Sequence, residues 1–163
     1  MARKPTFEVL VGTHGDTVLR VCRAVVGHAD ADDAWSETFL SAMRAYPHLQ
    51  ADANIEAWLV TIAHRKAVDI IRKTARVATP MAVPPDINVV ADQGEVGHNP
   101  DLADALQRLP PKQRQAVAYH YLAGLPYTEV AAIMGGNPAA ARRAAADAIA
   151  SLRRSIPSNA IKK

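Results

Sequence analysis

Apolar residues recur along most of this chain at intervals of three and four positions, which is the period of an amphipathic α-helix. The pattern predicts three helices in the first half, over residues 7–27, 30–46 and 55–75. Shorter helices are predicted in the second half, over residues 101–109, 111–123, 126–134 and 138–154. Abundant alanine and few aromatic residues (5%) favour closely packed helices over a β-sandwich. We therefore expect an all-α fold.

The predicted helix over residues 30–46 has two different faces. Phe39 and Met43 belong to an apolar stripe with the spacing of a buried face. Asp30 is the expected N-cap, because an Asp side chain can accept hydrogen bonds from the free N–H groups at a helix start. The opposite face carries Asp33, Glu37, Leu40 and Arg44. For an isolated helix, a solvated surface is the simplest interpretation of this second face.

The next predicted helix, residues 55–75, is basic toward its C-terminal end. Asn54 is placed as its N-cap. Its outward face is predicted to contain Thr61, His64, Arg65, Asp69, Arg72, Lys73 and Arg76, with Lys66 beside them. Cations near a helix C-terminus complement the helix dipole. A row of basic side chains also suits contacts with phosphate, and the spacing alone leaves both interpretations open.

The last two predicted helices have the pattern of a helix-turn-helix. A short helix ends at Gly135-Gly136-Asn137, and Pro138 is suited to the first turn of the helix that follows. In this motif the N-terminal residues of the second helix reach DNA base edges. Arg142 and Arg143 are therefore placed to contact phosphate or guanine. Surface arginines that only aid solubility are the alternative, and the charge distribution favours the DNA interpretation.

That charge distribution is uneven along the chain. Residues 77–100 contain four prolines, three acidic residues and no Lys or Arg, which is typical of a linker. Residues 101–163 contain nine Lys and Arg against four Asp and Glu. A mixed first part, an acidic connector and a basic end indicate two modules with different partners.

Several classes of protein find no support in the sequence. No run of 18 apolar residues is present, so we expect no membrane insertion, and the N-terminus lacks the apolar core of a secretory signal. Cys22 is the single cysteine and lies in an apolar helical run, which suits a reducing cytoplasm. The six histidines have no metal-ligand spacing, and no Gly-rich phosphate loop is present. We therefore expect that the protein is not an enzyme and has no catalytic residues, metal site or cofactor.

Four motifs, in order, resemble a bacterial extracytoplasmic-function sigma factor of the sigma-70 family. Asp30-Ala31-Asp32-Asp33 with Glu37-Thr38-Phe39-Leu40 is similar to region 2.2. Ala57-Trp58-Leu59 through Asp69 and Arg72 is similar to regions 2.3 and 2.4. Leu109-Pro110-Pro111-Lys112-Gln113-Arg114 is similar to region 4.1. Gly124-Leu125-Pro126-Tyr127-Thr128-Glu129-Val130-Ala131 and the helix after Gly135 are similar to region 4.2.

The resemblance implies two small helical domains joined by a Pro-rich acidic linker: residues 1–76 as region 2, 77–100 as linker and 101–163 as region 4. It implies a transcription initiation factor that binds core RNA polymerase, through the β′ coiled coil and the β flap, and promoter DNA. An anti-sigma factor is a further implied partner. The implied polymerase-binding residues are Asp30, Asp33, Glu37, Leu40 and Arg44. Those for the −10 element are Asn54, His64, Arg65, Lys66, Arg72, Lys73 and Arg76, and those for the −35 element are Asn137, Ala139, Arg142 and Arg143.

Three features depart from the family pattern. His64-Arg65 stands where Arg-Asn is common, so the −10 preference is expected to differ. Pro126 stands where a capping Ser is common, which removes a cap worth about 1 kcal/mol. Alanines fill most outward positions of the last helix, so the −35 contact is expected to be weaker, more dependent on DNA shape, or aided by another factor.

A stand-alone helix-turn-helix regulator is the alternative function. Such a protein would have no use for the acidic face of helix 30–46 or for the acidic linker. It would also need a surface for dimerisation, because such regulators bind paired half-sites.

Overall fold

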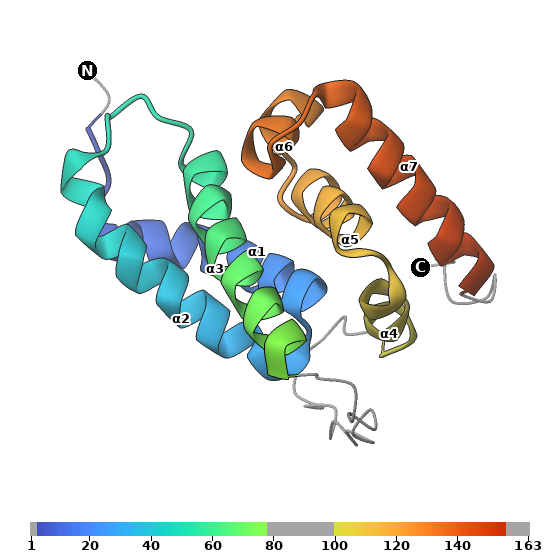
Figure 1. Cartoon of the computed structure of the whole chain (residues 1–163). Coiled ribbons are helices and arrows are strands. Elements are labelled where there is room, and N and C mark those ends of the chain that lie inside the picture. Colours follow the sequence, from blue (N-terminus) through green and yellow to red (C-terminus); the bar gives the residue numbers. More distant parts are fainter. Residues whose placement is uncertain (1–2, 78–99, 156–163) are drawn as a thin grey trace.

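The computed structural model describes residues 3–77 and 100–155, and the predicted linker lies almost wholly outside this part of the chain. Every regular element in the described residues is helical, which confirms the all-α prediction. Figure 1 shows the helices in two groups, with α3 lying between α2 and the second group. The first group comprises α1 (Phe7–Val26), α2 (His28–Ala45), the 3₁₀ turn η1 (Tyr46–His48) and α3 (Ile55–Val77). The second comprises α4 (Pro100–Arg108), α5 (Pro111–Val117), the π-helical turn η2 (Ala118–Leu122), α6 (Tyr127–Met134) and α7 (Pro138–Ser155).

A single glycine separates α1 from α2. Gly27 has φ 86° and ψ 167°, a backbone conformation that is strained for residues other than glycine. Its N–H donates a hydrogen bond to the Arg23 carbonyl at 3.0 Å. The chain reverses at this one residue, so α2 begins at His28. The prediction that Asp30 caps the helix is therefore wrong, and Asp30 lies in the first turn instead. A carboxylate there still complements the helix dipole.

The first group has its own apolar core, formed by α1, α2, η1 and one face of α3. Leu10, Phe39 and Leu59 are among its buried residues. Asn54 caps α3 as predicted, since its Oδ1 accepts a hydrogen bond from the Ala57 N–H at 3.1 Å. The predicted core position Met43 is wrong, because this side chain is 51% exposed. It lies at the margin of the α2 stripe, where the side chain is only half covered.

In the second group, small residues let the helices approach closely. The inward stripe of α7 contains Ala141, Ala145, Ala148 and Leu152, all buried as predicted. The predicted helix over 111–123 differs in detail, because its second half is a π-helical turn in which the Ala123 N–H donates to the Ala118 carbonyl at 3.1 Å. Pro126 provides no side-chain cap for α6, as the sequence indicated.

The two groups share a second apolar core. It contains Val21 and Val25 of α1 and Val60 of α3, packed in one cluster with residues such as Tyr119 and Val130 of the second group. Polar contacts reinforce it, since the Gln107 Nε2 donates to the Ala24 carbonyl at 3.0 Å, at the C-terminal end of α1. Helix α3 is therefore buried along two faces, one toward α1 and α2 and one toward the second group.

None of the helices in the described residues is long and apolar enough to cross a membrane.

Candidate functional site

The predicted docking face of α2 is open to solvent. Asp33, Glu37, Leu40 and Arg44 are all exposed, and they follow one another at intervals of four and three along the helix. Leu40 is 46% exposed, and Met43, which sequence reasoning assigned to the core, lies on the same helix one turn further along. Asp30 is half-buried in the first turn. Exposed apolar side chains framed by charges are typical of a protein-binding surface.

One of the predicted −10 residues contacts this docking face. The Lys66 Nζ lies 4.0 Å from the Glu37 Oε2, so the side chain crosses from α3 to α2. Such a partly exposed ion pair contributes about 1 kcal/mol or less to stability. Its effect here is on placement, because it holds the Lys66 amine beside an acidic group of the docking face.

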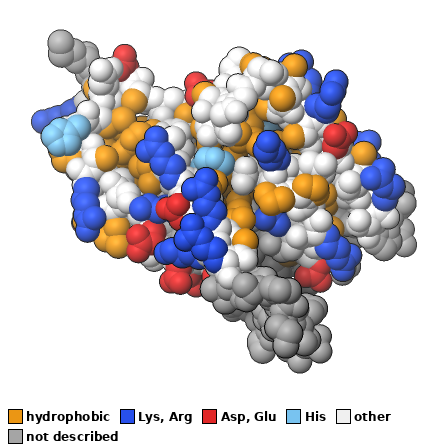
Figure 2. Space-filling view, in the orientation of Figure 1, with side chains coloured by type: hydrophobic (Ala, Val, Ile, Leu, Met, Phe, Trp, Pro, Cys, Tyr) orange, Lys and Arg blue, Asp and Glu red, His pale blue; other side chains and the backbone are white. Residues whose placement is uncertain are grey.

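The other basic side chains at the C-terminal end of α3 form an exposed row. Arg65, Arg72, Lys73 and Arg76 are all exposed, as the spacing predicted. Figure 2 shows Lys and Arg side chains gathered over α3 and recurring over the second group of helices. Asn54, at the other end of α3, is also exposed while its Oδ1 serves as the cap.

His64 does not face outward, and this prediction is wrong. Its ring is half-buried against the second group, and its Nδ1 lies 2.7 Å from the Oη of Tyr119. The two rings meet edge-on, with centroids 5.5 Å apart. Helical periodicity could not reveal this contact, because Tyr119 comes from a segment 55 residues away.

Burial sets the protonation of this pair. Desolvation, and then the charge of Arg65, lower the pKa of His64 below its usual 6.5. Burial raises the pKa of Tyr119, whose side chain is fully buried, so the phenol keeps its proton. A neutral imidazole and a protonated phenol can share a hydrogen bond in which Oη donates to Nδ1.

The helix-turn-helix predicted in the second group is present. Helix α6 ends at Gly135 in the left-handed conformation, and α7 begins at Pro138. Asn137 caps α7, because its Oδ1 accepts a hydrogen bond from the Ala140 N–H at 2.8 Å. This use in folding leaves the amide NH₂ of Asn137 as the group available to a ligand.

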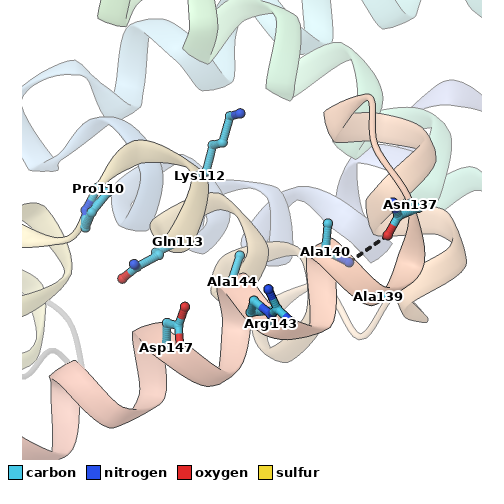
Figure 3. A pocket seen from close by; sticks show the side chains of 9 residues that line it. All are labelled: Pro110, Lys112, Gln113, Asn137, Ala139, Ala140, Arg143, Ala144 and Asp147. Atoms are coloured by element: carbon cyan, nitrogen blue, oxygen red, sulfur yellow. Dashed lines mark hydrogen bonds between the residues drawn. The ribbon is translucent and has the colours of Figure 1, made fainter.

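A groove runs between the start of α5 and the outer side of α7. Ala139 and Arg143 line it from α7, and Lys112 and Gln113 line it from α5 (Figure 3). Asp147 lies one turn beyond Arg143 on the same wall. Lys112 belongs to the motif similar to region 4.1, but it is not among the −35 residues expected from the sequence. The position of Lys112 at the start of a helix after Pro110-Pro111 was the available signal.

Arg142 lies apart from this groove. Its guanidinium carbon is 5.3 Å from the centroid of the Tyr127 ring, on the side of α7 next to α6. The two predicted arginines are thus exposed on different sides of one helix. Among the described residues, no group of three or more His, Cys, Asp or Glu side chains is arranged to hold a metal ion.

Two family models match the chain, in the same order as these surfaces. "Sigma-70 region 2" matches residues 10–77, which include the α2 face and the α3 row. "Sigma-70, region 4" matches residues 101–152, which include the helix-turn-helix. The stand-alone regulator is therefore not favoured, since it leaves the region 2 match without a purpose.

Curated relatives extend over both parts. The ECF RNA polymerase sigma factor BldN of Streptomyces coelicolor is 33% identical over 94% of this chain and 61% of its own length. The ECF sigma factor SigE of Mycolicibacterium smegmatis is 32% identical, over 82% of this chain and 55% of its own length. The sigma factor CarQ of Myxococcus xanthus is 32% identical, over 83% of this chain and 80% of its own length. The chain thus spans under two thirds of the first two relatives and most of the third.

Solved structures share the fold. The sigma factor RpoE in complex with the anti-sigma factor NepR, from Bartonella quintana, superposes with a TM-score of 0.74 at 20% identity, covering 96% of this chain and 98% of that one. CnrH in complex with the cytosolic domain of CnrY gives a TM-score of 0.64 at 24% identity, covering 91% and 85% of the two chains. At these identities the likeness is one of fold.

Proposed function

The chain belongs to the extracytoplasmic-function group of the sigma-70 family, and on that premise we propose that it binds core RNA polymerase and directs it to specific promoters. In this role it recognises the −10 and −35 promoter elements and catalyses no reaction itself. We assign polymerase docking and −10 recognition to residues 1–76, the connector to 77–100 and −35 recognition to 101–163.

The main support for this function is the exposed face of α2. The α2 face has exposed Leu40 and Met43 set among the exposed charges of Asp33, Glu37 and Arg44. We propose that this face binds the coiled coil of the β′ subunit, with Asp30 at its edge. The charged side chains there contribute orientation and association rate more than affinity.

The DNA contacts follow from the exposed basic side chains. Arg65, Arg72, Lys73 and Arg76 form the row that suits phosphates of the −10 region. Asn54, Lys66 and His64 are the further −10 candidates, and of these His64 is held against Tyr119. Its use on DNA therefore requires the two groups of helices to separate at this point.

For the −35 element, the proposed contacts come from the start of α7. Arg143 and Ala139 lie at the groove, where Lys112 adds a second cation. Asn137 and Arg142 complete the set, with a cap and a ring contact as their roles within the fold. The second group of helices is also the proposed partner of the β flap.

We further propose an anti-sigma factor as a regulator. The support is that RpoE, which shares the fold, was solved in complex with the anti-sigma factor NepR. Because these partners are cytoplasmic, we propose that the protein acts in the cytoplasm. No cofactor or metal ion has a role in the proposed function.

Binding to core polymerase tests the docking face. In a pull-down with core polymerase, Asp33→Lys combined with Glu37→Lys should lose most of the binding, because two favourable charges become repulsive. Asp16→Lys is the matched control, since Asp16 is an exposed acid on α1 and not part of the α2 face. If the wild-type chain does not bind core polymerase, the proposed function fails. If wild type binds core polymerase and the double variant binds it equally well, the assigned face is wrong.

Run-off transcription on genomic DNA tests promoter selection. Core polymerase with this protein should start at a defined set of sites that share −10 and −35 sequences. Start sites identical to those of core polymerase alone would contradict the proposal.

A further inference from the structure

Three side chains form a stack at the entrance to the helix-turn-helix. The rings of His120 and Tyr127 are nearly parallel, with an angle of 13° between their planes and 3.9 Å between centroids. The Arg142 guanidinium carbon lies 5.3 Å from the centroid of Tyr127. The stack thus joins η2, the first residue of α6 and the second turn of α7.

His120, which supports the Tyr127 ring, is anchored to the backbone. Its Nδ1 lies 2.8 Å from the Leu125 carbonyl oxygen, an acceptor, so Nδ1 carries the proton and donates. Leu125 is itself buried, at 2% exposure. Tyr121 meets the His120 ring edge-on, with centroids 4.7 Å apart. The ring on which Tyr127 rests is therefore fixed from two directions.

Arg142 is exposed although it contacts Tyr127. A guanidinium above an aromatic ring keeps its N–H groups available for other acceptors, which are the groups that bind phosphate. A long flexible side chain normally loses rotamer entropy when it binds, and holding it in place beforehand reduces that loss. The stack therefore restricts Arg142 without occupying its hydrogen-bond donors.

The direction of Arg142 distinguishes phosphate from bases as its target. In a helix-turn-helix the first helix crosses the DNA backbone, and the N-terminal part of the second reaches base edges. Arg142 lies beside Tyr127, the first residue of α6, whereas Arg143 lines the groove on the outer side of α7. Arg142 thus lies on the side of α7 that faces α6, and α6 is the helix expected to cross the DNA backbone.

We propose that Tyr127, resting on His120, is a positioning residue that holds Arg142 for contact with a phosphate of the −35 DNA. This inference rests on the proposed function, because it requires that α7 binds promoter DNA. It assigns the ring of Tyr127 a role in DNA affinity in addition to any role in folding.

The salt dependence of promoter binding tests this role. Holoenzyme is assembled from core polymerase and a saturating amount of each variant, and its affinity for a mapped promoter is measured between 50 and 200 mM salt. Each phosphate contact contributes about 0.9 to the slope of log K against log salt concentration. Arg142→Ala should reduce the slope by about 1. Tyr127→Leu should reduce it by a similar amount, and Tyr127→Phe, which keeps the ring, should restore the wild-type slope.

A double variant separates positioning from folding. If Tyr127 acts through Arg142, Tyr127→Leu combined with Arg142→Ala should reduce the slope by about 1 and not by about 2. Arg153→Ala is the matched control, because it removes an exposed cation from the last turn of α7, outside the stack, and should leave the slope unchanged. On a promoter fragment that ends downstream of the −35 element and so lacks its phosphates, wild type and variants should show equal slopes.

Several outcomes would overturn the inference. These are an unchanged slope in Arg142→Ala, an unchanged slope in Tyr127→Leu, or additive effects in the double variant. If Tyr127→Leu does not fold, His120→Ala takes its place, since it keeps Tyr127 and removes the supporting ring with its hydrogen bond to Leu125. It should weaken promoter binding in the wild-type background and have no effect in the Arg142→Ala background. Failure of every variant and of wild type to bind core polymerase would instead refute the proposed function.

Discussion

At the scale of single residues, His64 shows how a basic position acquires a structural role. Its sequence neighbours Arg65 and Lys66 are charged, and the helical pattern groups it with them. In the fold its Nδ1 is 2.7 Å from Tyr119 Oη, inside the contact between the two groups of helices. The partially desolvated imidazole is therefore more stable in its neutral form.

Because of this residue, the free energy of unfolding should decrease as the pH is lowered. In the folded protein, burial and next the charge of Arg65 lower the pKa of His64 below the usual value of 6.5. The unfolded chain then binds more protons at this site than the folded protein, so the free energy of unfolding decreases as the pH falls below about 6.5. Urea unfolding at pH 7.5 and 5.5 measures the change. His64→Gln keeps a hydrogen-bond acceptor for Tyr119 and does not titrate, so it should lose less stability than wild type. Equal losses would contradict the prediction.

At the scale of elements, the junction between α1 and α2 determines where the docking face begins. Gly27 reverses the chain with φ 86° and ψ 167°, and α2 starts at the next residue. A Cβ at this position would also meet the Gln107 Oε1 at 3.2 Å. The same residue therefore fixes the angle of α2 and the approach of α4.

Two glycine substitutions in or next to one helix should have opposite effects. Gly27→Ala is expected to lower the free energy of unfolding by about 1–3 kcal/mol, because alanine is strained in this conformation. Gly12→Ala should raise it by up to about 1 kcal/mol, since alanine favours a helix more than glycine does. Nothing lies within 4 Å of a Cβ at Gly12, which makes it the matched control. Chemical denaturation of both variants measures the difference, and an equal or higher stability for Gly27→Ala would show that the junction tolerates a side chain.

Helix α3 is the element that connects the proposed activities. One face packs with Leu59 in the core of the first group, and another packs with Val60 in the core shared by both groups. The exposed remainder carries the basic row that ends at Arg76. A shift of the second group would therefore change access to α3 without disturbing the first core.

At the scale of the whole molecule, the shared core makes the two groups one cooperative unit. Val21, Val60, Tyr119 and Val130 belong to a single buried cluster, although they come from both halves of the chain. If the first group of helices were isolated, its residues in this cluster, such as Val21 and Val60, would be exposed to water. Its burial is thus a source of stability that both halves share.

Calorimetry should detect this coupling. The wild-type chain is expected to unfold in one transition, with equal calorimetric and van't Hoff enthalpies. Val60→Asp places a charge in the shared core and should split the transition in two, because an unpaired buried charge is strongly destabilising there. Phe39→Asp, placed in the core of the first group alone, should instead lower the temperature of a transition that stays single, because the shared core still couples the two groups. Two separate transitions in the wild-type protein would contradict the coupling.

The sequence by itself determined the helices, their order and several of their details. Periodicity and the Gly and Pro positions located α1 to α7 within a few residues, and the short side chains of α7 indicated its buried face. Asn54 was identified as a cap because the residue that precedes a helix acts locally, on N–H groups two or three positions away. The exposure of Asp33, Glu37, Leu40 and Arg44 followed from the same local geometry. Family resemblance added the function, and the family matches confirmed the membership.

Only the tertiary structure decided which helix covers which face. Periodicity states which side chains share one side of a helix, but it does not say what packs there, because that partner is distant in the chain. His64 turned inward because Tyr119 approaches α3, and Lys66 turned toward Glu37. Met43, at the margin of the apolar stripe of α2, is half exposed. The stack beneath Arg142 has the same origin, since η2, α6 and α7 meet at one corner only after the chain has folded.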